Sequence, residues 1–224
     1  RWNIDLMHGL PGQDAQSGTA DLTEAVGRSA GHISWYQLTI ERNTHFWSAP
    51  PALPEESTLE SIQQAGEAIL ADAGLHQYEV SAFSKEGEES RHNLNYWRFG
   101  DYIGLGAGAH GKISLSDGTI IRTQRTRAPA DYLAVTASSP LAPPQGVAIS
   151  PAETITEFAM NTLRLKSGVP LSHFAQTTGV TVEQLTAAAE TAVSRGWLEA
   201  PYTGHFVTTP LGYQFLDSVI ETFL

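Results

Sequence analysis

Residues 92–111 are the stretch of this chain richest in chemically useful side chains. Their sequence, HNLNYWRFGDYIGLGAGAHG, places imidazole, carboxamide, phenol and indole groups beside a run of glycines. Imidazole and phenol groups can bind a metal or a ligand, and glycine lets the backbone approach a ligand closely. The same residues also suit a glycine-rich strand and turn with a histidine at the surface. The residue types alone favour neither interpretation.

Asp5 is a second candidate, because it interrupts the largely apolar strand NIDLM. A carboxylate in such a strand costs free energy unless it is hydrogen-bonded. Parallel sheets bind ligands at the carboxyl ends of their strands, where a carboxylate can accept hydrogen bonds from both hydroxyls of a ribose. The alternative is a carboxylate bonded to nearby backbone N–H groups, and the residue types alone favour that alternative.

The elements that would position Asp5 alternate between strand and helix. We expect strands at residues 3–9 and 32–40, with a helix over 18–30 between them. This β-α-β order predicts a parallel sheet with a right-handed crossover. A helix over 56–73 and a strand over 77–84 are expected to follow.

The second half of the chain changes from strands to helices. Asp117-Gly118 lies between two β-like runs and predicts a hairpin, and the prolines of residues 138–151 predict a linker. Beyond the linker we expect a winged-helix-like module of three helices, a small hairpin and a closing helix, at residues 153–166, 171–178, 182–195, 197–208 and 211–224. The predicted organisation is therefore a barrel-like domain over 1–137, a linker over 138–151 and a C-terminal domain over 152–224.

Composition narrows the classes of protein that remain. The chain has 224 residues, a formal net charge of −11 and no cysteine. Winged-helix modules often bind DNA, but residues 151–224 contain three basic side chains against seven acidic ones, so we expect no nucleic-acid partner. No apolar run reaches the roughly 18 residues of a membrane-spanning helix, and no signal peptide is visible. We therefore expect a cytoplasmic protein without a transmembrane segment.

Four motifs in collinear order resemble one known family. They are NIDLMHGLPGQ near the start, ISWYQLTIE, HNLNYW, which fits an HNxxYW signature, and the later GAGAHG. Together they resemble the oxygen-independent coproporphyrinogen oxidase-like proteins and, within these, the haem-chaperone (HemW-type) branch of the radical SAM proteins. The resemblance covers essentially the whole chain, and several motifs in the right order make it specific.

This resemblance implies both a fold and a function. The fold would be α/β: the C-terminal part of a radical SAM partial (β/α) barrel with antiparallel additions, followed by a small winged-helix-like domain. The function would be to bind haem and transfer it to acceptor proteins, with S-adenosylmethionine and a [4Fe–4S] cluster as cofactors, and a homodimer is compatible with it. The alternative is an oxygen-independent coproporphyrinogen III oxidase of porphyrin biosynthesis, which the HNxxYW element disfavours.

The resemblance also implies where the adenosyl cofactor would bind. Asp5 matches the aspartate that holds the ribose of S-adenosylmethionine, and Tyr36 and Thr39 lie on the strand that runs along the adenine in relatives. Core packing for Tyr36 and a strand-edge hydroxyl for Thr39 are the alternatives. His8, next to Gly9 near the same strand end, is a further candidate.

A haem-handling role would fall on the HNxxYW residues His92, Asn93, Tyr96 and Trp97. An imidazole or a phenolate can bind haem iron, an indole can pack against a flat macrocycle, and an amide can hold the second imidazole nitrogen. Equally, the first two residues could cap a turn while the two aromatic side chains are buried. His110 is a weaker candidate, and the remaining histidines are expected on the surface or in loops, namely His32, His45, His76, His173 and His205.

The cluster of this family requires cysteines that the sequence lacks. Relatives hold the cluster with a CxxxCxxC loop, and iron–sulfur clusters need thiolate ligands. Because the chain starts at Arg1 inside a strand-like segment and has no cysteine, we expect a truncated part of a longer protein. We expect no metal site and no radical chemistry in this part alone.

Overall fold

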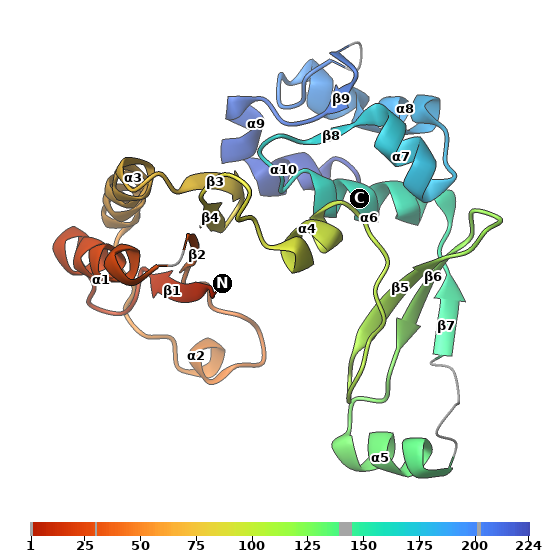
Figure 1. Cartoon of the computed structure of the whole chain (residues 1–224), viewed down its shortest axis with the longest axis horizontal. Helices are drawn as coiled ribbons and strands as arrows, with labels where there is room; N and C mark the ends of the chain where they lie inside the picture. Colours follow the sequence, from red (N-terminus) through yellow and green to blue (C-terminus); the bar gives the residue numbers. More distant parts are fainter. Residues whose placement is uncertain (1, 30, 139–144, 201–202) are drawn as a thin grey trace. The chain divides into compact units, whose positions relative to one another are not determined.

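Figure 1 shows the computed structural model, which describes residues 2–29, 31–138, 145–200 and 203–224. The chain divides into two units, Arg1–Ser90 and Arg91–Leu224, and each has its own hydrophobic core. Helices and sheets occur in both, and the sheet of the first unit is mixed, which confirms the predicted α/β class. Among the described residues, no helix combines the length and the apolar character needed to cross a membrane.

The first unit is built on a four-stranded sheet in the order β1-β2-β4-β3. Strand β1 (Ile4–His8) runs parallel to β2 (His32–Gln37), and helix α1 (Ala15–Arg28) connects them. The predicted β-α-β unit is therefore confirmed. The helix begins three residues before the predicted start at residue 18, because the Asp14 carboxylate accepts a hydrogen bond from the Ser17 N–H and caps it.

The remaining elements of this unit extend the sheet beyond β2. After the short helix α2 (His45–Ser48), helix α3 (Glu56–Asp72) leads to strands β3 (His76–Glu79) and β4 (Ala82–Ser84), which pair antiparallel. The single strand predicted over 77–84 is wrong, because the chain turns between these two strands and β4 pairs with both β2 and β3.

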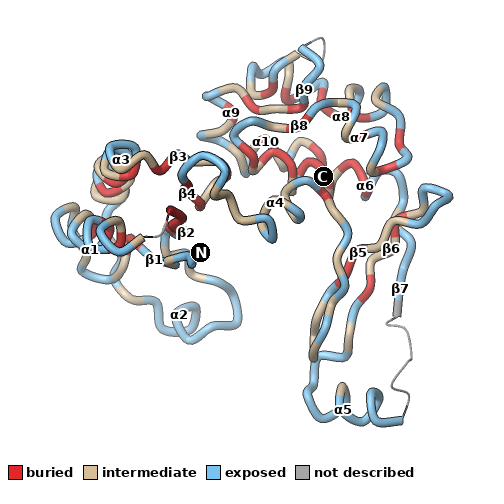
Figure 2. The backbone as a smooth tube through the Cα atoms, in the orientation of Figure 1, coloured by how far each residue is buried: buried red, intermediate tan, exposed pale blue. Residues whose placement is uncertain are grey.

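Helices α1 and α3 pack together, and the residues that they bury join those of the strands in one core (Figure 2). Successive side chains of a strand point to opposite faces of the sheet. Ile4 and Leu6 of β1 accordingly pack on this core, and Asp5 and Met7 lie on the opposite face. The core residues are Leu22, Ala25, Ile33, Trp35, Ile62, Leu70, Leu75 and Phe83.

The core of the second unit lies among three helices, α6 (Pro151–Thr162), α7 (Leu171–Thr178) and α8 (Val182–Ser194). The fully buried Phe158 is central to it, with the ring centroid of Phe174 4.9 Å away. Ser150 and Thr181 begin α6 and α8 with capping boxes, in which the side chains of the first and fourth residues bond each other's backbone N–H.

Short elements complete this helical part. Strands β8 (Val169–Pro170) and β9 (His205–Phe206) pair antiparallel, and helices α9 (Pro210–Gln214) and α10 (Leu216–Glu221) follow. The single helix predicted over 211–224 is wrong, because Phe215 adopts φ −111° and ψ 38° and separates α9 from α10. The predicted winged-helix character of this region remains an expectation.

Before these helices, the second unit contains helix α4 (Arg91–Trp97) and a sheet in the order β5-β6-β7. The hairpin predicted at Asp117-Gly118 is confirmed between β5 (His110–Ser114) and β6 (Ile120–Gln124), where Gly118 has φ 88°. After β6 come helix α5 (Pro129–Ser138) and strand β7 (Gln145–Ala148).

The sequence-based domain boundaries, 1–137 and 152–224, stay predictions. The predicted linker over 138–151 overlaps β7 and the first residue of α6. Its residues Pro140, Pro143 and Pro144 lie outside the described residues.

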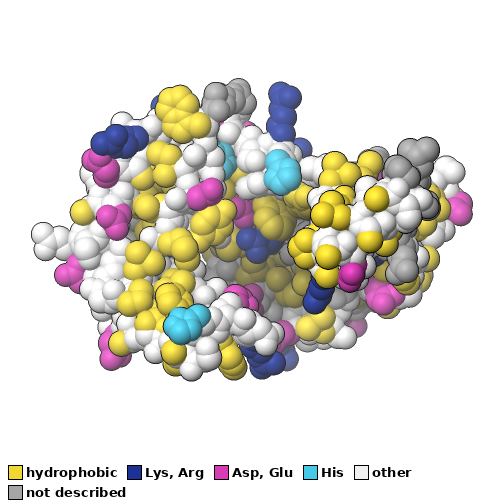
Figure 3. Space-filling view, turned by 90° about the horizontal axis from the view of Figure 1, so that it is seen from below, with side chains coloured by type: hydrophobic (Ala, Val, Ile, Leu, Met, Phe, Trp, Pro, Cys, Tyr) yellow, Lys and Arg dark blue, Asp and Glu magenta, His cyan; other side chains and the backbone are white. Residues whose placement is uncertain are grey.

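Apolar side chains are also exposed in the second unit. Helix α5 buries none of its residues, and its Leu133 and Val135 side chains are 65% and 49% exposed. On the face seen in Figure 3, apolar side chains are interspersed with acidic and basic ones. Such exposure occurs on ordinary protein surfaces and does not identify a site by itself.

Gly66 sets how closely α3 approaches the sheet, because an added Cβ would overlap the indole ring of Trp35. We predict that Gly66→Ala destabilises the protein by roughly 1–3 kcal/mol, since overpacking a dense core forces side chains or backbone to shift. Urea unfolding followed by circular dichroism measures the change. Gly27→Ala in α1 is the matched control: nothing lies within 4 Å of its added Cβ, so stability should rise by roughly 0.5–1 kcal/mol. Equal stability of the two variants would contradict this packing.

His8 makes folding sensitive to acid. Its side chain is buried against Trp35, with ring centroids 4.2 Å apart, and burial lowers its pKa from 6.5 to about 4. Between these values the unfolded chain binds a proton that the folded chain does not, so stability falls as the pH drops from 6.5 towards 4. We predict a loss of roughly 1–3 kcal/mol over this range.

Urea unfolding at several pH values measures this loss. His8→Phe should flatten the profile, and substitution of the exposed His76 by Gln should leave it unchanged. A His8→Phe profile as steep as that of the wild type would assign the acid sensitivity to other groups, of which His32 is the first candidate, because burial lowers its pKa too.

Candidate functional site

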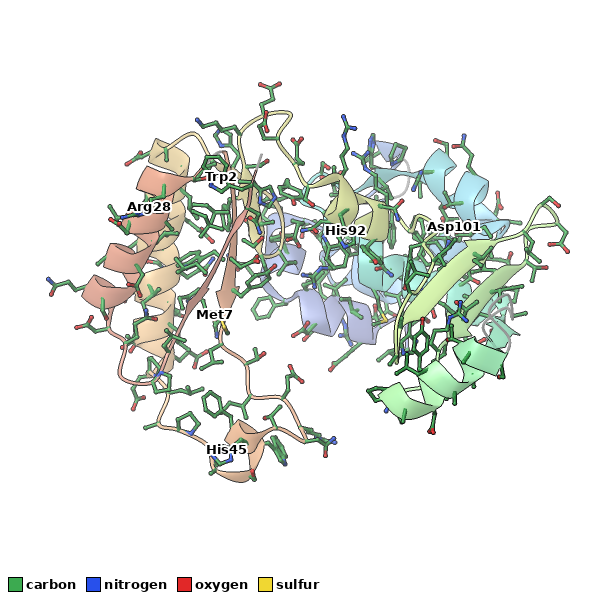
Figure 4. The ribbon with its side chains drawn as sticks, turned by 60° about the horizontal axis from the view of Figure 1, so that its bottom comes forward. Trp2, Met7, Arg28, His45, His92 and Asp101 are labelled. Atoms are coloured by element: carbon green, nitrogen blue, oxygen red, sulfur yellow. The ribbon has the colours of Figure 1, made fainter. Side chains whose placement is uncertain are left out.

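The first candidate site is the face of the β1–β2 pair opposite α1 and α3. The register pairs Asp5 with Ser34 and Met7 with Tyr36, so alternate residues of the two strands share this face. Asp5 is exposed, and the side chains of Met7 and Tyr36 are 42% and 38% exposed. Figure 4 labels Trp2 just before β1 and Met7 towards the strand's end. We call the residues Asn3, Asp5, His32, Ser34 and Tyr36 the polar face.

Asn3 connects three other side chains of the polar face. Its amide Nδ2 donates hydrogen bonds to Asp5 Oδ1 at 2.8 Å and to Ser34 Oγ at 3.0 Å. Its Oδ1 lies 2.7 Å from His32 Nδ1, and His32 Nε2 lies 2.9 Å from the Tyr78 hydroxyl. The hydrogen bonds thus run in one chain from Tyr78 of β3 through His32 of β2 and through Asn3, which precedes β1, to the Asp5 carboxylate.

The second oxygen of the Asp5 carboxylate accepts no hydrogen bond from the described residues. No backbone N–H group of the described residues donates a hydrogen bond to this carboxylate. The alternative open from the sequence, a carboxylate bonded to backbone N–H groups, is therefore not seen among them. An exposed carboxylate with a remaining acceptor can receive a ribose hydroxyl, so the polar face is chemically suited to an adenosyl cofactor.

The other residues expected near such a cofactor are placed differently. Tyr36 shares the polar face, whereas Thr39 lies beyond the end of β2 and donates a hydrogen bond to Glu41 at 3.3 Å. His8 is buried against Trp35 in the core under the helices, so it lies on the other side of the sheet. The expectation that His32 is a surface or loop residue is wrong, because it is 7% exposed within β2.

The second candidate site is on α4. His92 and Tyr96 are one helical turn apart, with the histidine exposed and its ring edge-on to the phenol at 4.9 Å between centroids. Tyr96 in turn contacts Tyr102, whose ring centroid is 4.5 Å away. Figure 4 labels His92 on its helix. We call His92, Tyr96 and Tyr102 the aromatic cluster.

Tyr102 is held in place by a charged pair. Arg122 Nη1 donates a hydrogen bond to the Tyr102 hydroxyl at 2.9 Å, and its Nε donates to Glu157 Oε2 at 2.7 Å. Burial would lower the pKa of this guanidinium, but the hydrogen bond and charge of Glu157 outweigh that effect and raise it. The cluster is therefore a solvent-accessible imidazole beside two phenols, with one phenol fixed by a permanent cation.

The other residues of the HNxxYW segment contribute less to an exposed site. Trp97 packs against the core of the second unit and lies under the Arg164 guanidinium, 4.2 Å from the ring centroid. Asn93 is half-buried. Residues 91–97 form a helix, so the glycine-rich strand and turn that residues 92–111 also suited does not extend over this first part.

Packing explains two glycines of the run after α4, Gly104 and Gly111. A Cβ added at Gly104 would overlap the backbone of His110, and one added at Gly111 would overlap the Thr123 hydroxyl. His110 itself is exposed at the start of β5. These two glycines therefore allow neighbouring stretches of the chain to approach each other closely. Their role is in packing.

A metal cluster does not fit the residues of this chain. The sequence has no cysteine, and the described residues contain no group of three His, Cys, Asp or Glu side chains placed to hold a metal. We therefore derive no step through an iron–sulfur cluster from these residues.

Sequence reasoning missed Asn3, His32 and Tyr102. The period of a strand could have placed Asn3 and Asp5 on one face, because they are two residues apart. His32 and Tyr102 left no comparable signal, since their partners Tyr78 and Arg122 are distant in the sequence.

Comparisons with known proteins agree with the resemblance of the motifs. The family described as HemN C-terminal domain matches residues 149–215. "Heme chaperone HemW" of Escherichia coli is 40% identical over 229 aligned residues, covering 100% of this chain and 57% of the relative. The protein of the same name from Haemophilus influenzae gives the same identity and coverage. The chain thus spans a little over half the length of these relatives.

A solved structure shows a similar fold. Coproporphyrinogen III oxidase (HemN) from Escherichia coli, described as a radical SAM enzyme, matches with a TM-score of 0.73 and 16% sequence identity over 99% of this chain and 54% of that one. At this identity the likeness concerns the fold alone. The chain is thus similar along its whole length, at 40% identity, to proteins named "Heme chaperone HemW", and its residues 149–215 match the family described as HemN C-terminal domain.

Proposed function

We propose that this chain is the haem-handling part of a radical SAM haem chaperone, which binds haem and passes it to an acceptor protein. One observation carries the proposal: in a chain 40% identical to proteins named "Heme chaperone HemW", the HNxxYW residues His92 and Tyr96 place an exposed imidazole beside a half-buried phenol on α4. The whole-protein activity remains a proposal, because the chain spans only 57% of that relative.

Within the aromatic cluster, His92 and Tyr96 are the residues we assign to haem iron. Both side-chain types bind haem iron in proteins, and i,i+4 spacing places them on the same face of α4. Trp97 lies under Arg164 and packs on the core, so its indole is already engaged within the protein. A surface position for the iron ligands suits transfer, because an acceptor protein can reach a ligand that solvent reaches.

The polar face supports a second part of the proposal. Asp5 would receive a ribose hydroxyl of S-adenosylmethionine, with Tyr36 on the same face as a further contact. The cofactor would supply the radical chemistry of the family when a cluster is also present. Any [4Fe–4S] cluster would have to be held by cysteines outside these 224 residues, because they include none.

A coproporphyrinogen oxidase activity is the weaker alternative. Its support is the likeness in fold to HemN at 16% identity, whereas the relatives at 40% identity are named haem chaperones. Formation of decarboxylated product from coproporphyrinogen under anaerobic, reducing conditions by the full-length protein would favour the oxidase instead.

We predict that His92→Ala and Tyr96→Phe each weaken haem binding by about tenfold or more, because each removes a group assigned to the iron. Titration of the chain with ferric haem, followed by its Soret absorption, measures the affinity. His205→Ala is the control, since this histidine is also exposed in the second unit and lies outside the cluster. Wild-type affinity in both cluster variants would remove the aromatic cluster from the haem site.

We also predict that Asp5→Asn lowers the affinity of the full-length protein for S-adenosylmethionine by roughly tenfold or more. The substitution keeps the shape of the side chain but removes the charge that strengthens its hydrogen bonds to hydroxyl groups. Isothermal titration calorimetry measures the affinity. Glu60→Gln on α3 removes an exposed acidic charge elsewhere in the same unit and should have no effect. If both variants bind equally, Asp5 is not a cofactor contact.

A further inference from the structure

We propose that Asn3 and His32 are positioning residues that orient the Asp5 carboxylate towards the adenosyl cofactor. The inference rests on the proposed cofactor contact at Asp5. It adds two residues that do not touch the cofactor in this scheme, and it assigns His32 one particular tautomer.

The geometry of the hydrogen bonds fixes which atom donates at each step. The Asp5 carboxylate can only accept when ionised, so the Asn3 atom 2.8 Å from it is the amide nitrogen. The same nitrogen donates to Ser34 Oγ at 3.0 Å. The other end of the amide, Oδ1, then faces His32 Nδ1 at 2.7 Å and can only accept.

His32 must therefore carry its proton on Nδ1. In a neutral imidazole the second nitrogen is then an acceptor, which matches the Tyr78 hydroxyl 2.9 Å from Nε2. A positively charged ring is disfavoured, because burial lowers the pKa of His32 even though the charges of Asp5 and Glu89 raise it in part. Every polar atom of the imidazole is thus used within this chain of hydrogen bonds.

Burial makes His32 the anchor of the chain of hydrogen bonds. The side chain is 7% exposed and belongs to β2, which is paired on both sides, with β1 and with β4. Asp5 of β1 and Asn3 just before this strand are exposed, so without this anchor their side chains would be free to rotate between rotamers. Ordering a flexible side chain costs conformational entropy, and a network that orders it beforehand removes that cost from ligand binding.

A purely structural histidine is the competing explanation, since a buried imidazole with two partners also stabilises a sheet. The two explanations differ in what a change at position 32 does to cofactor affinity when stability is preserved. His32→Asn retains a donor near the position of Nδ1 and should keep the Asn3 amide oriented. His32→Leu keeps the volume approximately but removes the donor.

The test measures binding of S-adenosylmethionine to the full-length protein by calorimetry, together with thermal stability. We expect Asn3→Ala and His32→Leu to weaken binding about tenfold, as removal of a group that orients a ligand does in other sites. His32→Asn should bind within about twofold of the wild type. The control, His76→Gln, changes an exposed histidine of β3 and should have no effect.

The outcomes separate this inference from the proposed function. If Asp5→Asn loses binding while Asn3→Ala and His32→Leu bind like the wild type, the positioning role is refuted and the cofactor contact stands. If Asp5→Asn itself binds normally, the proposed contact fails and the positioning role fails with it. Equal loss of affinity in His32→Asn and His32→Leu would also refute the role of the Nδ1 donor.

A second measurement needs neither cofactor nor a variant that folds poorly. Nitrogen-15 NMR of the 224-residue chain reports which imidazole nitrogens carry a proton. We expect His32 to show a protonated Nδ1 and a bare Nε2, and Asn3→Ala, an exposed substitution, to perturb the Nδ1 signal. A proton on Nε2 in the wild type would overturn the proposed direction of the hydrogen bonds.

Discussion

The register between β1 and β2 is the constraint on which the first unit depends. It pairs Leu6 with Trp35 and Asp5 with Ser34, so the apolar side chains meet under the helices and the polar ones meet on the other face. A shift of β1 by one residue would exchange its two faces, placing the Asp5 carboxylate in the core and the apolar Ile4 and Leu6 on the polar face. The cost of that exchange fixes the register, and the register in turn brings together side chains that are about thirty residues apart along the chain. The polar face is therefore a consequence of how the core is packed.

In helix α4, helical spacing likewise separates the side chains that pack on the core from those on the opposite side. Leu94 and Trp97 are three residues apart and pack on the core, while His92 and Tyr96 are four residues apart on the opposite side. The apolar pair holds the helix, which leaves the imidazole and phenol outside. The HNxxYW signature thus combines residues that pack on the core with an exposed imidazole and a half-buried phenol that remain potential ligands.

The sequence patterns predicted correctly those elements that depend on residues close together in the chain. The β1–α1–β2 unit followed from its alternating pattern, and the β5–β6 hairpin followed from Asp117-Gly118. The break at Phe215 was missed because the apolar spacing of residues 211–224 continues through it. Asp5 and His92 were predicted from residue type and motif, whereas His32 was missed because its partners, Asn3 and Tyr78, lie 29 and 46 residues away. Hydrogen bonds between distant residues depend on the sheet, and a single sequence does not show which strands will be neighbours.

A buried histidine usually serves stability, and His8 and His32 show how the same residue type can differ in what it does. His8 lies against Trp35 on the helix side of the sheet, and its Nδ1 has no hydrogen-bond partner among the described residues. Both nitrogens of His32 have partners, and one leads to an exposed carboxylate. An imidazole that only fills space needs no particular tautomer, whereas one that orients an amide does. The tautomer of His32 therefore distinguishes a positioning residue from a packing residue more directly than its burial does.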